Sequence, residues 1–205
     1  MMTQNETDVP DLLVGLPPIS SEHLATLHDR LTTRAQEEGV LDVAYRTLDT
    51  PVGSLLLAAT GKGLVRVAFA AEDHGAVLAA LAAQVSPRVL NAPRRLDATA
   101  RELEEYFAGQ RHAFDLPLDF SLAKGFRLKV LSQLPGIGYG STASYGAVAA
   151  LAGSPRAVRA VGTACATNPL PVVVPCHRVV RADGTPGGYL GGPDAKRLLL
   201  GLEAA

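Results

Sequence analysis

The sequence predicts an α/β protein in two parts, a small N-terminal α/β domain with an antiparallel sheet and a C-terminal helical domain that contains a helix-turn-helix. Short strand-like segments separated by glycine turns, within residues 41–69, predict the sheet. Short helical segments separated by glycine, within residues 126–164, predict the helical domain. The predicted divisions are an N-terminal extension with one helix (1–40), the α/β domain (41–120) and the helix-turn-helix domain (121–205).

The charge distribution separates the same two parts. Residues 1–120 hold 10 Lys/Arg and 17 Asp/Glu, whereas residues 121–205 hold 9 Lys/Arg and 3 Asp/Glu. The net charge of −1 argues against a nucleic-acid partner, but a basic C-terminal half is typical of a phosphate-binding surface. A solvated basic face without a partner is the other interpretation.

The extension and the α/β domain have recognisable start and stop signals. Ser20 and Ser21 are N-cap residues for a helix that ends near Gly39. Its apolar stripe predicts packing against the rest of the protein and consists of Leu24, Leu27, Leu31 and Ala35. The further predicted elements are strands at 41–47, 53–59, 64–69 and 87–91, and helices at 72–85 and 96–108.

The C-terminal domain is expected to contain helices at residues 126–134, 145–151, 155–164 and 194–202. Ser144 and Ser154 cap the middle two helices, and Pro155 occupies the first turn of the second one, where proline is favoured. Gly153 separates them. Two short helices joined by a glycine turn are the layout of a helix-turn-helix.

The second helix of this motif has an unusual side-chain pattern. Arg159 lies among Ala157, Ala160 and Gly162, so a surface can come close to the helix backbone while the arginine reaches into it. Bulky outward side chains would keep a helix out of the narrow minor groove of DNA. An ordinary packed helix with one surface arginine is the alternative.

The cysteines and the hydropathy of the chain indicate its cellular compartment and argue against metal binding and membrane association. Two cysteines and a polar N-terminus without a signal sequence predict a location in the reducing cytoplasm. A disulfide between Cys165 and Cys176 is therefore disfavoured. No Cys/His set has zinc-site spacing, so we expect no metal, and we expect no other cofactor. No apolar run has transmembrane length, so we expect no association with a membrane.

A cysteine followed by a histidine is the strongest sign of chemistry. Cys176 and His177 come directly after the apolar run Val172–Pro175. A thiolate is a strong nucleophile, and a neighbouring histidine can take the thiol proton. Pro175 fixes φ and lacks a backbone donor, which suits a rigid presentation of the thiol. A buried structural cysteine is the alternative interpretation.

Six short motifs follow one another along the second half of the chain. They are Ser144-Tyr145, Arg159-Ala160-Val161-Gly162, Asn168-Pro169-x-Pro171, Pro175-Cys176-His177-Arg178-Val179, Gly188-Tyr189-x-Gly191-Gly192 and Lys196…Leu199-Leu200…Glu203. In this order they resemble the O6-alkylguanine-DNA alkyltransferase family. Thr50-Pro51-x-Gly53 and Glu102-Leu103-x-x-Tyr106-Phe107-x-Gly109 resemble the smaller domain of that family. The resemblance covers residues 41–203 and implies a ribonuclease-H-like N-terminal domain and a winged-helix-like C-terminal domain.

The resemblance also implies catalytic roles. Cys176 would take the alkyl group from guanine O6 by direct displacement, and His177 would act as the base through a water molecule. Glu203 would hold the other imidazole nitrogen, as the third member of a nucleophile, base and orienter set. Asn168 would brace the turn beneath the site. Nothing in the sequence would cleave the resulting thioether, so each molecule would react once.

The implied partner is double-stranded DNA that carries O6-alkylguanine. The damaged base must leave the duplex before a thiol can reach it. Arg159 would fill the gap left by the flipped nucleotide, and Tyr145 would help to displace the base. The other residues expected at the DNA are Arg127 and Ser154, which would contact phosphates, and Ala157 and Ala160, which would allow close approach.

The expected base pocket is lined by Val179, Tyr189, Leu190, Gly191 and Cys165. Tyr189 would stack on the base, and a packing aromatic is the alternative. Leu190 departs from the small hydroxyl residue that some relatives carry, which changes the pocket size. Cys165 is expected to pack, with a second alkylation or oxidation site as the alternative.

We therefore predict a DNA-repair protein that transfers methyl and larger alkyl groups from O6-alkylguanine to Cys176, with O4-alkylthymine as a second substrate. The alternative is a non-catalytic DNA-binding protein that recognises lesions or senses alkylation. A multiple-turnover thiol hydrolase is a further alternative. No obligate protein partner is expected.

Overall fold

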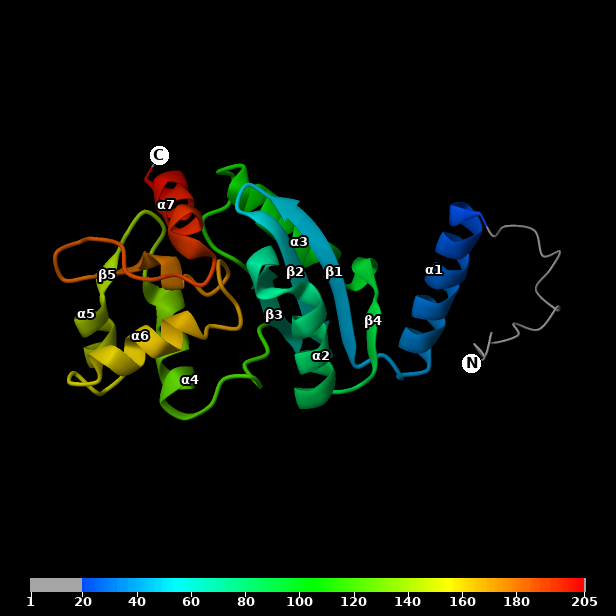
Figure 1. Cartoon of the computed structure of the whole chain (residues 1–205), viewed down its shortest axis with the longest axis horizontal. Coiled ribbons are helices and arrows are strands. Elements are labelled where there is room, and N and C mark those ends of the chain that lie inside the picture. Colours follow the sequence, from blue (N-terminus) through cyan, green and yellow to red (C-terminus); the bar gives the residue numbers. More distant parts are fainter. Residues whose placement is uncertain (1–19, 205) are drawn as a thin grey trace, which may run out of the picture.

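The computed structural model describes residues 20–204 and places a four-stranded sheet beside a helical C-terminal part (Figure 1). The sheet has the order β3-β2-β1-β4 and consists of β1 (Val43–Thr50), β2 (Gly53–Thr60), β3 (Gly63–Phe69) and β4 (Val89–Asn91). The first three strands are antiparallel, as the glycine turns predict, but β4 pairs with β1 in parallel. The sheet is therefore mixed, because the chain reaches β4 through helix α2 (His74–Gln84) and not through a hairpin.

Both faces of the sheet are covered. Alternate residues of a strand point to opposite sides. Leu55 and Leu57 of β2 belong to a core shared with α3 (Asp97–Phe107) and the C-terminal helices, whereas Leu56 packs with α2. This burial explains why β2 is a continuous apolar run and does not alternate with polar residues.

The N-terminal helix α1 (Ser21–Glu37) begins where its cap predicts, since Ser20 Oγ accepts a hydrogen bond from the backbone of the first turn. The leucines of its apolar stripe, however, do not pack. Leu24, Leu27 and Leu31 are 53%, 43% and 55% exposed, and no residue of this helix is buried. The prediction that the stripe packs against the protein is therefore wrong for its three leucines, whereas Ala35 packs against the small apolar cluster of Leu41, Ala44 and Ala92.

Polar contacts attach α1 to the edge of the sheet. His28 Nε2 is hydrogen-bonded to the carbonyl of Asn91 in β4, and Asp29 pairs with Arg94. Figure 1 shows α1 beyond β4, on the side of the sheet away from the C-terminal part. In this position its leucines have no apolar surface of the described chain to cover.

The C-terminal part consists of short helices. They are α4 (Gly125–Leu131), a 3-10 turn (Leu134–Gly136), α5 (Tyr145–Leu151), α6 (Val158–Ala166) and α7 (Gly192–Glu203). Two further strands, β5 (Ala143–Ser144) and β6 (Val179–Val180), form a parallel pair. No helix within residues 20–204 is long and apolar enough to cross a membrane.

Helices α5 and α6 form the helix-turn-helix, with one difference from the prediction. The Ser144 hydroxyl caps α5 by accepting from Ala147 N at 3.1 Å, as expected. The second helix starts at Val158 and not at Ser154, so Ser154 is not its cap and Pro155 is not in its first turn. The reason is a tight turn in which Ser154 O accepts from Ala157 N at 2.9 Å.

The two parts of the chain share one apolar core, and this contact positions the site. Val67 N of β3 donates to Pro169 O at 2.8 Å, directly beside the predicted active-site turn. Phe69, at the end of the same strand, lies against Gly191, where an added Cβ would be 2.6 Å from the ring. The position of Gly191 therefore requires a glycine.

Candidate active site

Cys176 lies in a buried turn at the end of the apolar run and is 1% exposed. The backbone of this turn is unusual, because Val172 has φ of +72°. A β-branched residue in the left-handed region costs about 1–3 kcal/mol, so surrounding contacts must hold it there. Val174 N donates to Leu170 O at 2.7 Å across the turn, and the valine side chains are buried.

Asn168 connects this turn to the thiol. Its Nδ2 donates to Val174 O at 2.9 Å and to Cys176 Sγ at 3.2 Å, and its Oδ1 accepts from Leu170 N at 3.0 Å. The side chain is completely buried. Asn168 therefore braces the turn and also presents a donor to the sulfur, which favours the thiolate.

Burial raises the pKa of Cys176 to about 11, even though the Asn168 hydrogen bond and the charge of Lys196 lower it. The resting group at neutral pH is consequently a thiol. A nucleophilic reaction at this sulfur needs a base that takes its proton.

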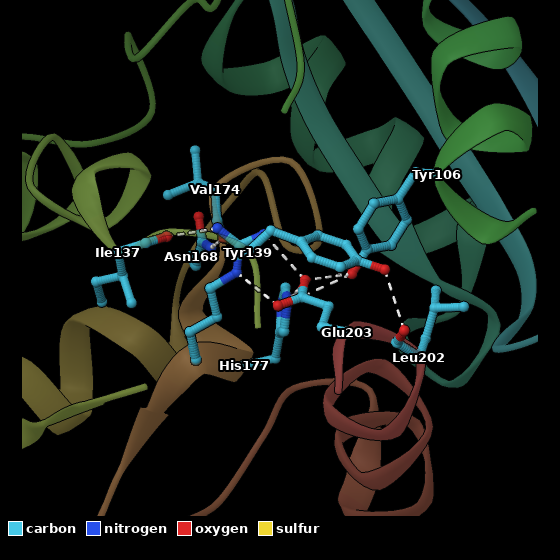
Figure 2. Close-up of polar contacts among 9 residues, drawn as sticks. Tyr106, Ile137, Tyr139, Asn168, Val174, His177, Leu202 and Glu203 are labelled. Carbon is cyan, nitrogen blue, oxygen red and sulfur yellow. Dashed lines mark hydrogen bonds and ion pairs between the residues drawn. The ribbon is translucent and has the colours of Figure 1, made fainter. Parts of the chain in front are cut away.

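His177 has the geometry of such a base. The ring is completely buried, and its Nε2 lies 2.8 Å from Glu203 Oε1 at the end of α7 (Figure 2). Within residues 20–204, nothing hydrogen-bonds to the buried Nδ1. Because the carboxylate receives the proton on Nε2, Nδ1 is free to accept one. Burial lowers the pKa of His177, opposed by Glu203, which keeps the ring neutral at pH 7.

Glu203 is held by more than the imidazole. Arg178 donates from Nε to Oε2 at 2.8 Å and from Nη2 to Oε1 at 2.9 Å, and Tyr106 Oη donates to Oε1 at 2.6 Å. Burial alone would raise the pKa of Glu203, but the hydrogen bonds from His177 and Arg178 outweigh it and lower the pKa to about 2. Glu203 is therefore a fixed carboxylate.

Three buried polar residues of the site have no role in the prediction from sequence, namely Tyr106, Arg178 and Lys196. Lys196 is fully buried and donates from Nζ to Val179 O at 2.7 Å, on the strand that follows the reactive turn. One signal was available for Tyr106. It lies at helical spacing from Leu103 on the core face of its helix, and a buried tyrosine hydroxyl needs a partner.

Among the five predicted pocket residues, Val179 and Cys165 are buried and Tyr189 is half-buried. The Tyr189 ring lies edge-on to His177 and Phe69, with centroids 6.3 and 5.7 Å away, and its buried hydroxyl has no partner within residues 20–204. Val179 is buried next in sequence to the turn. Cys165 is also buried, and burial raises its pKa to about 12, which favours the packing interpretation.

The half-buried Leu190, also predicted to line the base pocket, lies in a separate cleft. It lines a cleft of about 370 Å³ between the two parts of the chain, together with Asn168 and Arg66. Arg127, predicted at a phosphate, lines the same cleft, and its Nη2 donates to Leu122 O.

The helix-turn-helix carries the other residues predicted at DNA. Arg159 and Ala160 are exposed on α6, while Ser154 and Ala157 are half-buried in the turn before it. Tyr145 begins α5 and points to the loop before Tyr189, since a Cβ on Gly187 would lie 2.3 Å from its hydroxyl. Tyr145 therefore lies beside the loop that leads to Tyr189.

Two family models match this chain. The model for the 6-O-methylguanine DNA methyltransferase, ribonuclease-like domain, matches residues 43–120, and the one for the DNA binding domain matches residues 125–205. The chain belongs to the 6-O-methylguanine DNA methyltransferase family. The resemblance predicted from the motifs is thereby confirmed, as is the predicted fold class.

Members of this family in several organisms are similar to the chain over most of their length. A methylated-DNA–protein-cysteine methyltransferase of Mycolicibacterium paratuberculosis is 38% identical over 161 residues, 78% of this chain and 92% of that protein. The constitutive enzyme of Bacillus subtilis is 38% identical over 166 residues, 78% and 94% of the two chains. The crystal structure of Mycobacterium tuberculosis OGT in complex with DNA has a TM-score of 0.65 at 37% identity, covering 78% and 92% of the two chains.

Proposed function

We propose that this protein repairs DNA by moving a methyl or larger alkyl group from O6-alkylguanine, and secondarily from O4-alkylthymine, to Sγ of Cys176. One observation carries the proposal. A buried thiol accepts a hydrogen bond from Asn168 and is followed in sequence by a histidine whose Nε2 is held by Glu203 and whose Nδ1 has no hydrogen-bond partner among the described residues. Family membership supports the same chemistry.

The reaction is a displacement at carbon. The Cys176 thiol gives its proton to His177 Nδ1 through a water molecule, and Sγ then attacks the alkyl carbon attached to guanine O6. The S–C bond forms as the C–O6 bond breaks and the electron pair leaves with the base, which becomes neutral guanine when the proton taken up by His177 passes to it through water. The imidazolium is stabilised by the Glu203 carboxylate. The thioether product retains the alkyl group, so each molecule reacts once.

The substrate base has to reach a thiol that is 1% exposed. We infer that the nucleotide is flipped out of the duplex and enters beside Tyr145 and Tyr189, while the exposed Arg159 occupies its place in the stack. The small neighbour Ala160 lets α6 come close to the groove. Arg127 and Ser154 remain proposed phosphate contacts, which are expected to make binding sensitive to salt.

We also infer that the protein acts in the cytoplasm. Both cysteines are free in the structure, and a reducing compartment keeps thiols in that state. The division of the chain at residues 40 and 120 into extension, α/β domain and helix-turn-helix domain is likewise a proposal.

Mass spectrometry of the reacted protein tests the function. After incubation with a duplex that contains O6-methylguanine, we expect one added methyl group on the peptide with Cys176 and restored guanine in the DNA. Cys165→Ala is the matched control and should react like the unaltered protein, whereas Cys176→Ala should bind the duplex without reacting. Loss of the lesion with an unmodified Cys176, or repeated turnover, would contradict the mechanism.

A further inference from the structure

Tyr106 connects the N-terminal part of the chain to the reactive pair. It lies on α3, within the ribonuclease-like part, whereas His177 and Glu203 belong to the C-terminal part. Its hydroxyl donates to Glu203 Oε1 at 2.6 Å and lies 3.5 Å from His177 Nε2. Figure 2 shows the ring entering from the side opposite α7, with its hydroxyl directed at the carboxylate.

The surroundings of Tyr106 fix both its position and its protonation. The side chain is completely buried, and its ring packs on those of Phe107, Phe114 and Tyr139, with centroids 5.3, 5.3 and 6.2 Å away. Burial and the neighbouring Glu203 raise the pKa of Tyr106. The phenol is therefore a permanent donor, and the carboxylate is its acceptor.

The two carboxylate oxygens of Glu203 accept different numbers of hydrogen bonds. Oε1 accepts from Tyr106, His177 and Arg178, whereas Oε2 accepts from Arg178. A donor on the oxygen that faces the imidazole withdraws negative charge from the histidine contact. It also fixes which oxygen faces the ring. Both effects act on the basicity and the orientation of His177.

We propose that Tyr106 is a positioning residue for the His177–Glu203 pair, so that the ribonuclease-like part completes the proton-accepting group of the other part. The proposal rests on the proposed function in treating His177 as the base. It gives the N-terminal part a direct effect on the reaction, in addition to its packing against the C-terminal part.

The variant Tyr106→Phe removes the hydroxyl and keeps the ring. We expect single-turnover methyl transfer at neutral pH to slow roughly tenfold, the size expected for one hydrogen bond to a charged group. The acid limb of the pH–rate profile should move to higher pH, because a carboxylate with one donor fewer holds the imidazolium more strongly. A role in packing alone would not move this limb.

Tyr139→Phe is the matched control. Tyr139 also loses a hydroxyl hydrogen bond in this variant, but that bond goes to the backbone carbonyl of Leu202 and not to Glu203. We expect its rate and pH profile to equal those of the unaltered protein. If Tyr106→Phe behaves like Tyr139→Phe, the proposal is overturned.

Nuclear magnetic resonance of the ¹⁵N-labelled imidazole tests the proposal without DNA. The pKa of His177 should rise in Tyr106→Phe and fall when Tyr106 is replaced by 3-fluorotyrosine, which is a stronger donor of the same shape. The second replacement keeps the test decisive if the phenylalanine variant is poorly folded. An unchanged His177 pKa in both would refute the role of Tyr106. Absence of methyl transfer in the unaltered protein would instead refute the proposed function.

A double variant tests whether Tyr106 acts through the carboxylate. In a Glu203→Gln background, Tyr106→Phe should cause no further slowing, because residues that act as one unit are not additive. Additive losses would show that the hydroxyl acts by another route and would overturn the proposal.

Discussion

At the scale of the residue, the site is defined by buried groups, most of whose polar atoms are hydrogen-bonded. The Cys176 thiol has a high pKa, the neighbouring imidazole is neutral, and Glu203 is a fixed carboxylate. Burial alone would make each of these groups inert. The hydrogen bond from Asn168 to the sulfur favours the thiolate, and the hydrogen bond from His177 to the carboxylate leaves Nδ1 as the proton acceptor.

Asn168 offers a sharp test at this scale. Asn168→Asp keeps the shape of the side chain but replaces the donor to Sγ by a negatively charged acceptor, which disfavours the thiolate. We expect methyl transfer to slow at least tenfold at pH 7.5, with its dependence on pH shifted to higher pH. We also expect a loss of about 1–3 kcal/mol of unfolding free energy, because the bond to Val174 O is lost as well. An unchanged transfer rate would show that the donor to sulfur is irrelevant.

At the scale of the element, the helix-turn-helix combines a surface function with a core function. One face of α6 packs Val161, Ala164 and Cys165 into the core, and the opposite face exposes Arg159. Helix α1 is different, because its leucines are exposed and its contacts with the sheet are polar, apart from Ala35. An amphipathic pattern therefore indicates a helix in both cases, but it does not indicate what covers the apolar face.

Arg159 should affect duplex substrates specifically. Arg159→Ala removes an exposed side chain, so the melting temperature should stay the same. Transfer from O6-methylguanine in duplex DNA should slow tenfold or more, whereas transfer from the free modified base should not change. Arg197→Ala is the control, because Arg197 is also exposed but lies on α7, paired with Asp194. Equal slowing on duplex and free base would contradict insertion of Arg159 into the stack.

The leucines of α1 should contribute little to stability. We expect Leu27→Gln to change the unfolding free energy by less than about 0.5 kcal/mol, as for other exposed positions. Leu81→Ala on α2 is the comparison, since that side chain is 2% exposed and its truncation should cost about 2–5 kcal/mol. Chemical denaturation measures both values. A large loss in Leu27→Gln would show that the stripe is covered in solution.

At the scale of the whole molecule, the two parts are joined by a continuous core and by charged groups buried within it. Arg178 and Glu203 are 6% and 4% exposed, and the carboxylate also receives Tyr106 from the N-terminal part. Such a cluster stabilises the protein only while its carboxylate is ionised. The stability of the entire chain should therefore depend on pH.

Acid should destabilise the protein in two ranges. The pKa of His177 is lowered from its ordinary 6.5, so the stability contributed by its neutral form is present above pH 6.5 and is lost as the pH falls below that value. Glu203 has a pKa of about 2 against an ordinary 4.5, so its contribution is present above pH 4.5 and is lost as the pH falls towards 2. Together with the linkage relation, this second shift corresponds to about 3 kcal/mol.

Denaturation curves measured from pH 7 to pH 2 test this expectation. Glu203→Gln should be less stable at pH 7 by about 3–5 kcal/mol, because it leaves Arg178 without its partner. The same variant should lose less stability between pH 4.5 and 2, since it has no carboxylate to protonate. Parallel curves for the two proteins would show that Glu203 is not responsible.

The sequence by itself determined the features that depend on residues close together in the chain. The cap at Ser144, the Cys176-His177 pair and the strands between glycine turns follow from local backbone preferences and from the period of apolar residues. Tertiary structure alone decided the parallel pairing of β4, the exposure of the α1 leucines and the contacts of Tyr106 and Arg178 with Glu203. The physical reason is that burial and ion pairing depend on which distant segments meet, and Tyr106 reaches a carboxylate 97 residues further along the chain.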